Sequence, residues 1–194
     1  MPEERLLVER ARGGDAQAFE QLYRTYVDRV YAYVAFRVRD GDLADDLTQE
    51  VFIQALRALG GYDWRGSLAP WLLRIARNTV VDHWRRQGRR RDRAQSAAEA
   101  GDEDEDSLIG RVPDVEGEDA VARAELALDR QRFTAAAESL TDLQQQVLAL
   151  RFSAELSIKE TAEIMGRSEG AIKNLQHHAL RALRRALGWD EEIE

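Results

Sequence analysis

The chain has 194 residues, of which 44% are hydrophobic, so it is long enough to form one or two small domains with buried cores. It contains no cysteine, which excludes disulfides, thiolate metal ligands and cysteine nucleophiles and suits a reducing compartment. Residues 1–15 lack the apolar core of a signal peptide, and no run approaches the roughly 18 apolar residues of a membrane span. We therefore expect a soluble, cytoplasmic protein.

The net charge of −8 is distributed unevenly along the chain. Residues 99–119 hold ten acidic residues against Arg111 alone, a charge of −9, so the other residues sum to +1. Residues 65–93 hold nine arginines against two aspartates, or +7, and residues 166–187 carry +4. Because phosphate groups are neutralised locally, these two basic segments are candidates for binding nucleic acid.

The first predicted elements are two helices. Asp15 can cap a helix in which apolar residues recur at intervals of three and four over residues 19–34. A second helix is predicted over residues 43–59, and the glycine pair 60–61 ends it. No part of the sequence has the alternating pattern that predicts a strand.

A third helix is predicted from Pro70, which suits a first helical turn, to about Gly88. Its apolar residues, up to and including Trp84, are expected to face a core. The polar and charged residues expected to face outward are Arg74, Arg77, Asn78, Asp82 and Arg85.

Residues 95–118 have the composition of a disordered linker, because they are acidic, contain glycine and lack aromatic residues. A helix is predicted over residues 120–139 beyond the linker. Two capping boxes, Thr141–Gln144 and Ser157–Glu160, and the N-cap residue Ser168 mark the starts of three further helices. The sequence thus predicts an all-α fold of two small helical domains joined by an acidic flexible linker.

Residues 156–183 have the pattern of a helix-turn-helix. Ala162 is small where two helices cross, Gly166 permits the positive φ of the turn, and Ile172 returns to the core. This arrangement presents the second helix to base edges in a DNA major groove. The residues expected to face outward are Glu169, Gly170, Lys173, Asn174, His177 and Arg181. The alternative is an ordinary helical hairpin with a solvated basic face.

On a helical wheel, the second predicted helix has a polar face opposite its apolar stripe. The residues of this narrow sector are Asp46, Gln49, Glu50, Ile53 and Arg57. An acidic face with one isoleucine near its middle fits a docking surface for a basic helix, because interfaces mix apolar and charged contacts. A face that is merely solvated is the alternative.

The short connection after the second helix contains Tyr62, Trp64 and Arg65. Bases stack on aromatic rings while arginines neutralise phosphates, so this composition favours binding of unpaired nucleic acid. Packing of both aromatic side chains into the core is the alternative.

Four segments occur in the order found in bacterial sigma factors of the extracytoplasmic-function group, and the chain resembles that family over both helical domains. The segments are FEQLYRTYVDRVYAY, DLADDLTQEVFIQALRAL, WLLRIARNTVVDHWRR and LQQQVLALRFSAELSIKETAEIMGRSEGAIKNLQHHALRAL. The resemblance implies a sigma region 2-like domain at residues 10–92, an acidic linker at 93–119 and a region 4-like helix-turn-helix domain at 120–188. It also implies a transcription initiation factor that is not an enzyme and uses no cofactor or metal.

The resemblance further assigns partners and residues. It implies binding to bacterial RNA polymerase core, through the clamp helices of the largest subunit and the flap region, and to promoter DNA as duplex and as melted non-template strand. The residues implied for core binding are Asp45, Asp46, Gln49, Glu50 and Ile53. Those implied for the minus-ten element are Tyr62, Trp64, Arg65, Ser67, Arg74, Arg77, Asn78, Asp82, Arg85 and Arg86. Those implied for the minus-thirty-five element are Arg167, Ser168, Glu169, Gly170, Lys173, Asn174, His177, His178 and Arg181.

Two more expectations come with the family. Such factors are often held inactive by an anti-sigma factor, and their acidic linker threads polymerase channels, although a solubilising spacer would have the same composition.

The chain departs from many relatives at His178, where arginine is common. A neutral histidine would hold phosphate less firmly, and its charge would vary near about pH 6.5.

Two other classes of protein combine a helix-turn-helix with basic helices. An enzyme acting on DNA would need a nucleophile or a metal cluster, and neither the three histidines nor the DEDED run offers one at fixed geometry. A repressor or activator that binds duplex DNA would need neither the aromatic connection nor the docking face.

Overall fold

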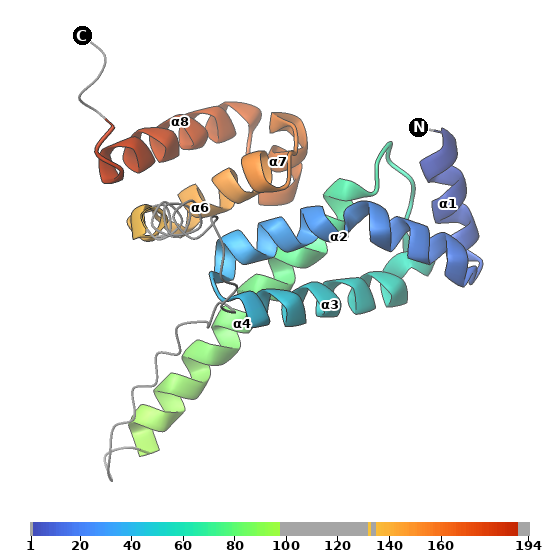
Figure 1. Cartoon of the computed structure of the whole chain (residues 1–194), viewed down its shortest axis with the longest axis horizontal. Coiled ribbons are helices and arrows are strands. Elements are labelled where there is room, and N and C mark those ends of the chain that lie inside the picture. The colour runs from blue at the N-terminus through green and yellow to red at the C-terminus, as the bar shows by residue number, and fades with distance from the viewer. Residues whose placement is uncertain (1, 98–131, 133–134, 190–194) are drawn as a thin grey trace, which may run out of the picture. The chain divides into compact units, whose positions relative to one another are not determined.

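The computed structural model describes residues 2–97, 132 and 135–189. The chain divides into two compact units, Met1–Arg111 and Val112–Glu194. Within the described residues every regular element is a helix or a helical turn (Figure 1), which confirms the predicted all-α class. None of the described helices combines the length and the apolar character needed to cross a membrane.

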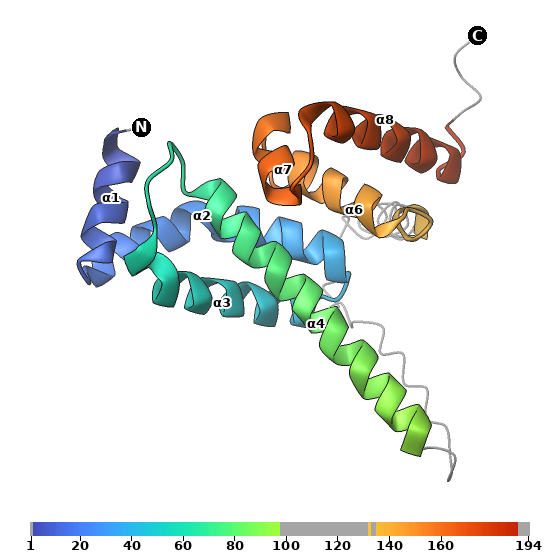
Figure 2. The same cartoon turned by 180° about the vertical axis from the view of Figure 1, so that it is seen from behind.

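The first unit is a bundle of helices. Its elements are α1 (Pro2–Arg12), α2 (Ala16–Val38), α3 (Gly41–Ala58), the 3-10 turn η1 (Leu59–Gly61) and α4 (Ala69–Ala97). Helices α2, α3 and α4 pack against one another, and α1 packs against α2 (Figures 1 and 2). The largest fully buried side chains of the unit are Val8, Val30, Tyr33, Val34, Val51, Leu59, Leu68 and Leu73.

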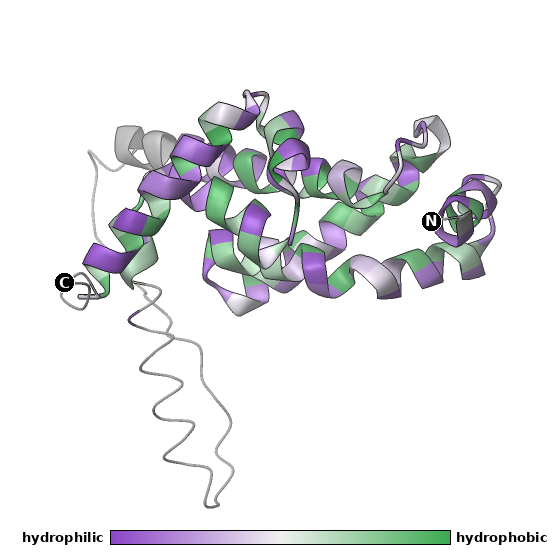
Figure 3. Cartoon of the chain, turned by 90° about the horizontal axis from the view of Figure 1, so that it is seen from above, coloured by the Kyte–Doolittle hydropathy of each residue, from purple (hydrophilic) through white to green (hydrophobic). Residues whose placement is uncertain are grey.

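Each of these helices has one buried face, and Figure 3 shows apolar and polar residues alternating around the helices in agreement with this. On α3, the period of 3.6 residues turns one stripe inward, and its buried members are Ala44, Leu47, Thr48, Val51, Phe52 and Ala55. The opposite stripe is therefore turned outward, which is the face that the sequence analysis singles out for docking.

Helix α1 is not assigned in the sequence analysis, and residues 2–9 precede the predicted domain at 10–92. In the structure Val8 and Ala11 are buried, so α1 contributes to the core of the first unit. Its two ends suit a helix, because Glu3 and Glu4 lie in the first turn and Arg10 and Arg12 in the last, where they complement the helix dipole.

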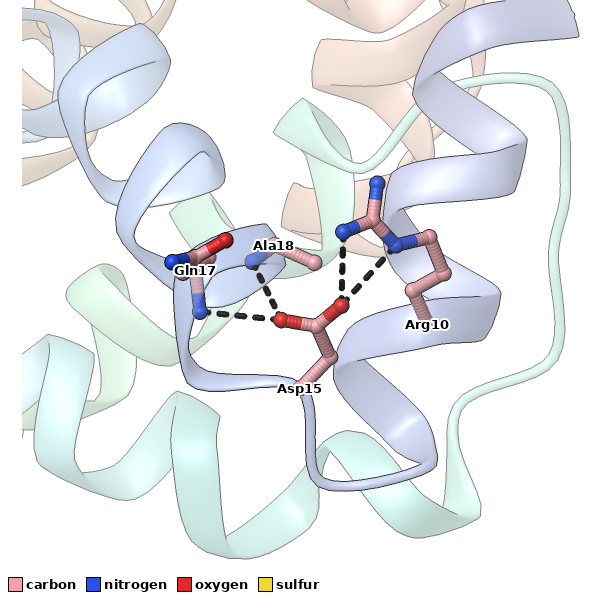
Figure 4. A network of polar contacts seen from close by, with 4 residues as sticks. All are labelled: Arg10, Asp15, Gln17 and Ala18. Atoms are coloured by element: carbon pink, nitrogen blue, oxygen red, sulfur yellow. Dashed lines mark hydrogen bonds and ion pairs between the residues drawn. The ribbon is translucent and has the colours of Figure 1, made fainter.

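Asp15 caps α2, as predicted (Figure 4). Its Oδ1 accepts hydrogen bonds from the backbone N–H of Gln17 at 3.0 Å and of Ala18 at 3.1 Å, and its Oδ2 lies 2.7 Å from Nη2 of Arg10. The hydrogen bond from the Ala18 amide lowers the pKa of the Asp15 carboxyl below its ordinary value of 3.8, and the hydrogen bond from Arg10 is the next largest cause. One side chain therefore starts α2 and ties it to α1.

The prediction that α4 ends at Gly88 is wrong, because the helix continues to Ala97. A glycine inside a helix costs only about 1 kcal/mol relative to alanine, and the arginines, glutamine and alanines around it are good helix formers. The first residues assigned to the acidic linker, 93–97, are accordingly helical in backbone. The rest of the predicted linker lies outside the described residues.

Trp84 is also placed differently from the prediction, since it is 40% exposed rather than buried in the core. Helix α4 runs on beyond the ends of α2 and α3 (Figures 1 and 2), so its later turns extend away from the other helices of the unit. Among the apolar residues predicted to face the core, Leu72, Ala76 and Val80 are buried and Ile75 is half-buried.

The second unit contains four described elements after the short helical stretch at residues 135–138. They are α6 (Asp142–Leu148), the π-helical turn η3 (Ala149–Ser153), α7 (Ile158–Met165) and α8 (Glu169–Ala186). Most of the helix predicted over 120–139 lies outside the described residues.

The helix ends of the second unit agree with the predicted signals. Thr141 and Ser157 both form complete capping boxes, with Gln144 and Glu160 respectively, and the Ser168 hydroxyl accepts from the Ala171 N–H at 3.2 Å. Gly166 adopts φ of 63° between α7 and α8, a conformation that costs little only for glycine. Ile172, predicted to return to the core, is buried, as are Leu156, Ala162, Ile164, Met165 and Ala179, while Leu175 and Leu183 are half-buried.

Candidate docking and nucleic-acid interfaces

The outer face of α3 is a polar surface with aliphatic side chains at its centre. Asp45, Asp46 and Gln49 are exposed, and Ile53 is 50% exposed. Glu50 is half-buried, and its Oε1 accepts from Gln54 Nε2 at 2.9 Å. The structure thus brings all five residues assigned to docking onto one helix, four of them exposed to solvent.

Leu56 joins this surface, although the sequence analysis does not include it. Its side chain is 53% exposed, and it follows Ile53 by three residues, so the two lie side by side on the helix. The wheel places Leu56 near the edge of the apolar stripe, and only the packing of α2 and α4 against α3 determines that this edge stays uncovered. We call Asp46, Gln49, Ile53 and Leu56 the α3 docking face.

The connection between η1 and α4 is organised by Tyr62. This side chain is only 5% exposed, its hydroxyl donates to the Ser67 carbonyl at 2.9 Å, and its ring lies 4.9 Å from that of Trp71. Burial raises the pKa of the Tyr62 hydroxyl. Of the two alternatives for Tyr62, the structure has the one in which its ring packs into the core, and its hydroxyl closes the loop.

The exposed part of the same connection is short. Asp63 and Arg65 are exposed, Trp64 is half-buried, and Gly66 adopts φ of 96°, where a side chain would be strained. Ser67 is half-buried, and its Oγ accepts from the Ala69 N–H at 3.3 Å. Trp64 and Arg65 are thus the aromatic and cationic groups that the loop offers to a ligand.

The outer face of α4 carries most of the predicted basic residues. Arg74, Asn78, Asp82, Arg85 and Arg86 are exposed, as expected, while Arg77 is half-buried. Residues 74, 78, 82 and 85 follow intervals of three and four and so share one face. Asp82 lies 3.7 Å from Nη1 of Arg85, an exposed ion pair of little energetic weight that leaves Arg85 available to another anion.

The set assigned to duplex DNA lies in the turn before α8 and on α8 itself. All nine residues are exposed, and they are Arg167, Ser168, Glu169, Gly170, Lys173, Asn174, His177, His178 and Arg181. The imidazole rings of His177 and His178 are 5.8 Å apart and nearly perpendicular, so they point in different directions. The helix start offers its backbone N–H groups beside these side chains, an arrangement that suits phosphate.

The inner side of α8 is fixed by a contact that the sequence analysis does not anticipate. Arg151 of η3 donates through Nε to Oε1 of Gln176 at 3.0 Å, and through Nη1 to the Leu156 carbonyl. The arginine therefore joins η3, the segment before α7 and α8, and it holds the rotation of α8 about its axis. The sequence near Arg151 does not predict its contact with Gln176, because the two residues are 25 positions apart.

Two helical units, one with a polar docking face and basic helix and the other with a helix-turn-helix, define the class of transcription initiation factors. Residues 22–90 match the family model described as Sigma-70 region 2, and residues 136–185 match Sigma-70, region 4. The chain belongs to the ECF RNA polymerase sigma factors, which regulate transcription and are not enzymes.

Among its relatives is the ECF RNA polymerase sigma factor BldN of Streptomyces coelicolor, with 40% identity over 182 residues, 93% of this chain. The chain spans 64% of the length of BldN. SigX of Bacillus subtilis is 32% identical over 173 residues, which cover 87% of this chain and 83% of SigX.

Solved structures of similar fold include CnrH in complex with the cytosolic domain of CnrY, with a TM-score of 0.67 and 24% identity over 97% of this chain and 99% of that one. The sigma factor RpoE, in complex with the anti-sigma factor NepR from Bartonella quintana, has a TM-score of 0.70 and 23% identity over 91% of this chain and 100% of its own. These likenesses support the two-unit helical fold.

Proposed function

We propose that the chain recruits core RNA polymerase to promoters by docking the α3 docking face on the clamp helices of the largest polymerase subunit. The observation that carries this proposal is the pair of half-exposed aliphatic side chains, Ile53 and Leu56, beside Asp46 and Gln49. Protein interfaces bury such apolar anchors inside a polar rim. A basic helix would complement the carboxylates and cover the two aliphatic side chains.

The loop after η1 and the outer face of α4 are proposed to capture the melted non-template strand of the minus-ten element. Trp64 leaves part of its ring uncovered for a base, and Arg65 stands beside it for phosphate. Extracting a base from the duplex costs about a few kcal/mol, which stacking and phosphate contacts can offset. Promoter opening would follow from binding the open strand better than the duplex.

The outer face of α4 would extend the track for this strand. The four exposed residues at 74, 78, 82 and 85 form a line along the helix, and Arg86 adjoins it. The guanidinium groups of Arg74, Arg85 and Arg86 can neutralise phosphates, a sequence-independent contribution that salt weakens. Tyr62 has no place in this contact, because its ring is buried.

Helix α8 is proposed to read the minus-thirty-five element as duplex DNA. Lys173 and Asn174 are exposed within the first turns of the helix, where side chains of a recognition helix reach base edges. Asparagine suits the paired donor and acceptor of adenine, and lysine suits the acceptors of guanine. The contact of Arg151 with Gln176 supports this reading, because it fixes which side of α8 faces outward.

Further partners are proposed for the exposed apolar residues of the second unit. Phe152 on η3 is exposed, as is Leu143 on α6, and apolar side chains of this size suit contact with the flap region of polymerase or with an anti-sigma factor. An inhibitor of that kind would compete with core polymerase, in the cytoplasm, for surfaces of both units. The complex of RpoE with NepR offers a precedent in a protein of similar fold.

The test is run-off transcription with purified core polymerase, the full chain and promoter DNA. Specific initiation in the absence of any other sigma factor is the expected result, and it would exclude a repressor or activator of duplex DNA. Failure to form a stable complex with core polymerase would refute the proposed function.

A further inference from the structure

The loop that precedes α4 is held at both of its ends by α1. The Arg12 Nη2 donates to the Gly60 carbonyl at 3.2 Å, at the start of the loop, and the Glu4 Oε1 accepts from the Leu68 N–H at 2.9 Å, at its end. Figures 1 and 2 both show this connection beside α1. The two α1 residues are eight positions apart on one helix face, a distance of about 12 Å.

The Glu4 carboxylate of α1 also accepts hydrogen bonds from two other parts of the unit. Its Oε1 accepts from the Tyr26 hydroxyl of α2 as well as from Leu68, which directly precedes α4. Tyr26 is buried, and burial, followed by the hydrogen bond to Glu4, raises the pKa of its hydroxyl above the ordinary value of 10.0. Val8, between Glu4 and Arg12 on the same helix face, is buried in the core, so α1 is anchored where it holds the loop.

Inside these two contacts the loop closes on itself. Tyr62 donates to the Ser67 carbonyl, and Ser67 Oγ accepts from the Ala69 N–H, so the frame of the loop is bonded while Arg65 is exposed and Trp64 half-buried. A loop held in this way has already lost conformational freedom before any ligand arrives, and binding therefore does not have to supply that ordering.

We propose that α1, through Glu4 and Arg12, positions the loop at residues 60–68 for the unpaired base, so that this helix takes part in promoter opening. Glu4 and Arg12 are proposed as positioning residues, because their hydrogen bonds go to the backbone at the two ends of the loop. Helix α1 lies outside the region 22–90 that matches sigma region 2. The inference rests on the proposed function, because it needs the loop to contact melted DNA.

The test uses the full chain assembled with core polymerase and a single-stranded oligonucleotide of the non-template sequence from a promoter that the wild-type holoenzyme transcribes. Glu4→Ala is expected to lower affinity for this strand about five- to thirtyfold, the loss that corresponds to one or two hydrogen bonds. Glu4→Gln retains an acceptor oxygen and is expected to lose less. Glu3→Ala is the matched control, because Glu3 is an exposed acid in the same helical turn.

Two further measurements separate positioning from general stability. Core affinity is expected to stay within about twofold of wild type for every α1 variant, while hydrogen exchange accelerates at the Leu68 amide, which loses its acceptor. Arg12 is exposed, so Arg12→Ala folds without difficulty and loosens only the Gly60 end of the loop. It is expected to weaken strand binding in the same direction as Glu4→Ala, by a smaller factor.

Trp64→Ala distinguishes failure of this inference from failure of the proposed function. If Trp64→Ala weakens strand binding while Glu4→Ala and Arg12→Ala do not, α1 has no positioning role and the proposed function stands. If Trp64→Ala leaves strand binding unchanged, the loop does not bind the strand and both ideas are refuted. Equal losses of core and strand affinity in Glu4→Ala and Arg12→Ala would also overturn the inference.

Discussion

Truncating Ile53 and Leu56 to alanine is expected to weaken binding of core RNA polymerase about 10- to 100-fold. The two side chains are 50% and 53% exposed, so about half of each remains to be buried on docking. Full burial of such a side chain contributes about 1.5–3 kcal/mol, and half of that for two residues gives about 1.5–3 kcal/mol in total. Each 1.4 kcal/mol corresponds to about a factor of ten in affinity.

The substitution also removes packing within the fold, because about half of each side chain is already buried there. By the same area estimate this costs about 1.5–3 kcal/mol of folding stability, which the high helix propensity of alanine offsets only in part. The thermal midpoint of the isolated chain is therefore expected to fall, and binding is measured at a temperature where the variant remains folded. Fluorescence anisotropy of the labelled chain, titrated with core polymerase at fixed salt, measures the affinity.

Leu6→Ala is the matched control for this experiment. Leu6 is 56% exposed, like the two α3 residues, but it lies on α1 and away from the α3 docking face. Its truncation is expected to leave core affinity unchanged. The reasoning fails if the double alanine variant binds core polymerase within about twofold of wild type, or if Leu6→Ala weakens binding equally.

Three further predictions concern charge and recognition. Asp46→Lys is expected to weaken core binding, more strongly at low salt, without changing DNA binding by the isolated chain; unchanged core affinity would refute the docking role of the carboxylate. Lys173→Ala or Asn174→Ala is expected to cost about 1–3 kcal/mol on the preferred duplex, measured by competition between sequences, and an equal loss on every sequence would mean a phosphate contact instead. The lowered pKa of Asp15 contributes stability that is present above its ordinary pKa of 3.8 and is lost as the pH falls through the lower folded value. In thermal melts, wild type is therefore expected to lose more stability than Asp15→Asn as the pH falls below 3.8; parallel losses in both proteins would contradict the assignment.

Features that depend on neighbours in the sequence were predictable. Asp15, Ser157 and Ser168 all cap helices as expected, because a capping side chain bonds to amides two or three residues away. Gly166 was predictable for the same reason, since the turn it occupies requires positive φ. The exposure of the assigned residues within α8 follows from helical periodicity once Ser168 is known to start the helix.

Features that depend on what packs opposite were not predictable. Trp84 has the spacing of a core residue but is 40% exposed, and Leu56 adjoins the apolar stripe of α3 but is 53% exposed. The sequence left open whether Tyr62 stacks on a base or packs into the core. In the structure its ring packs against that of Trp71, nine residues later in the chain. The contact of Glu4 with Leu68 joins residues 64 apart, and nothing near either residue indicates it.

The continuation of α4 through Gly88 shortens the segment that leaves the first unit. Residues 89–97 are helical, so these nine residues advance about 14 Å, whereas nine extended residues would span up to about 30 Å. They also leave the first unit in a fixed direction. Under the proposed function, these nine residues therefore add about 16 Å less to the span between the two DNA-binding units than an extended chain of the same length would.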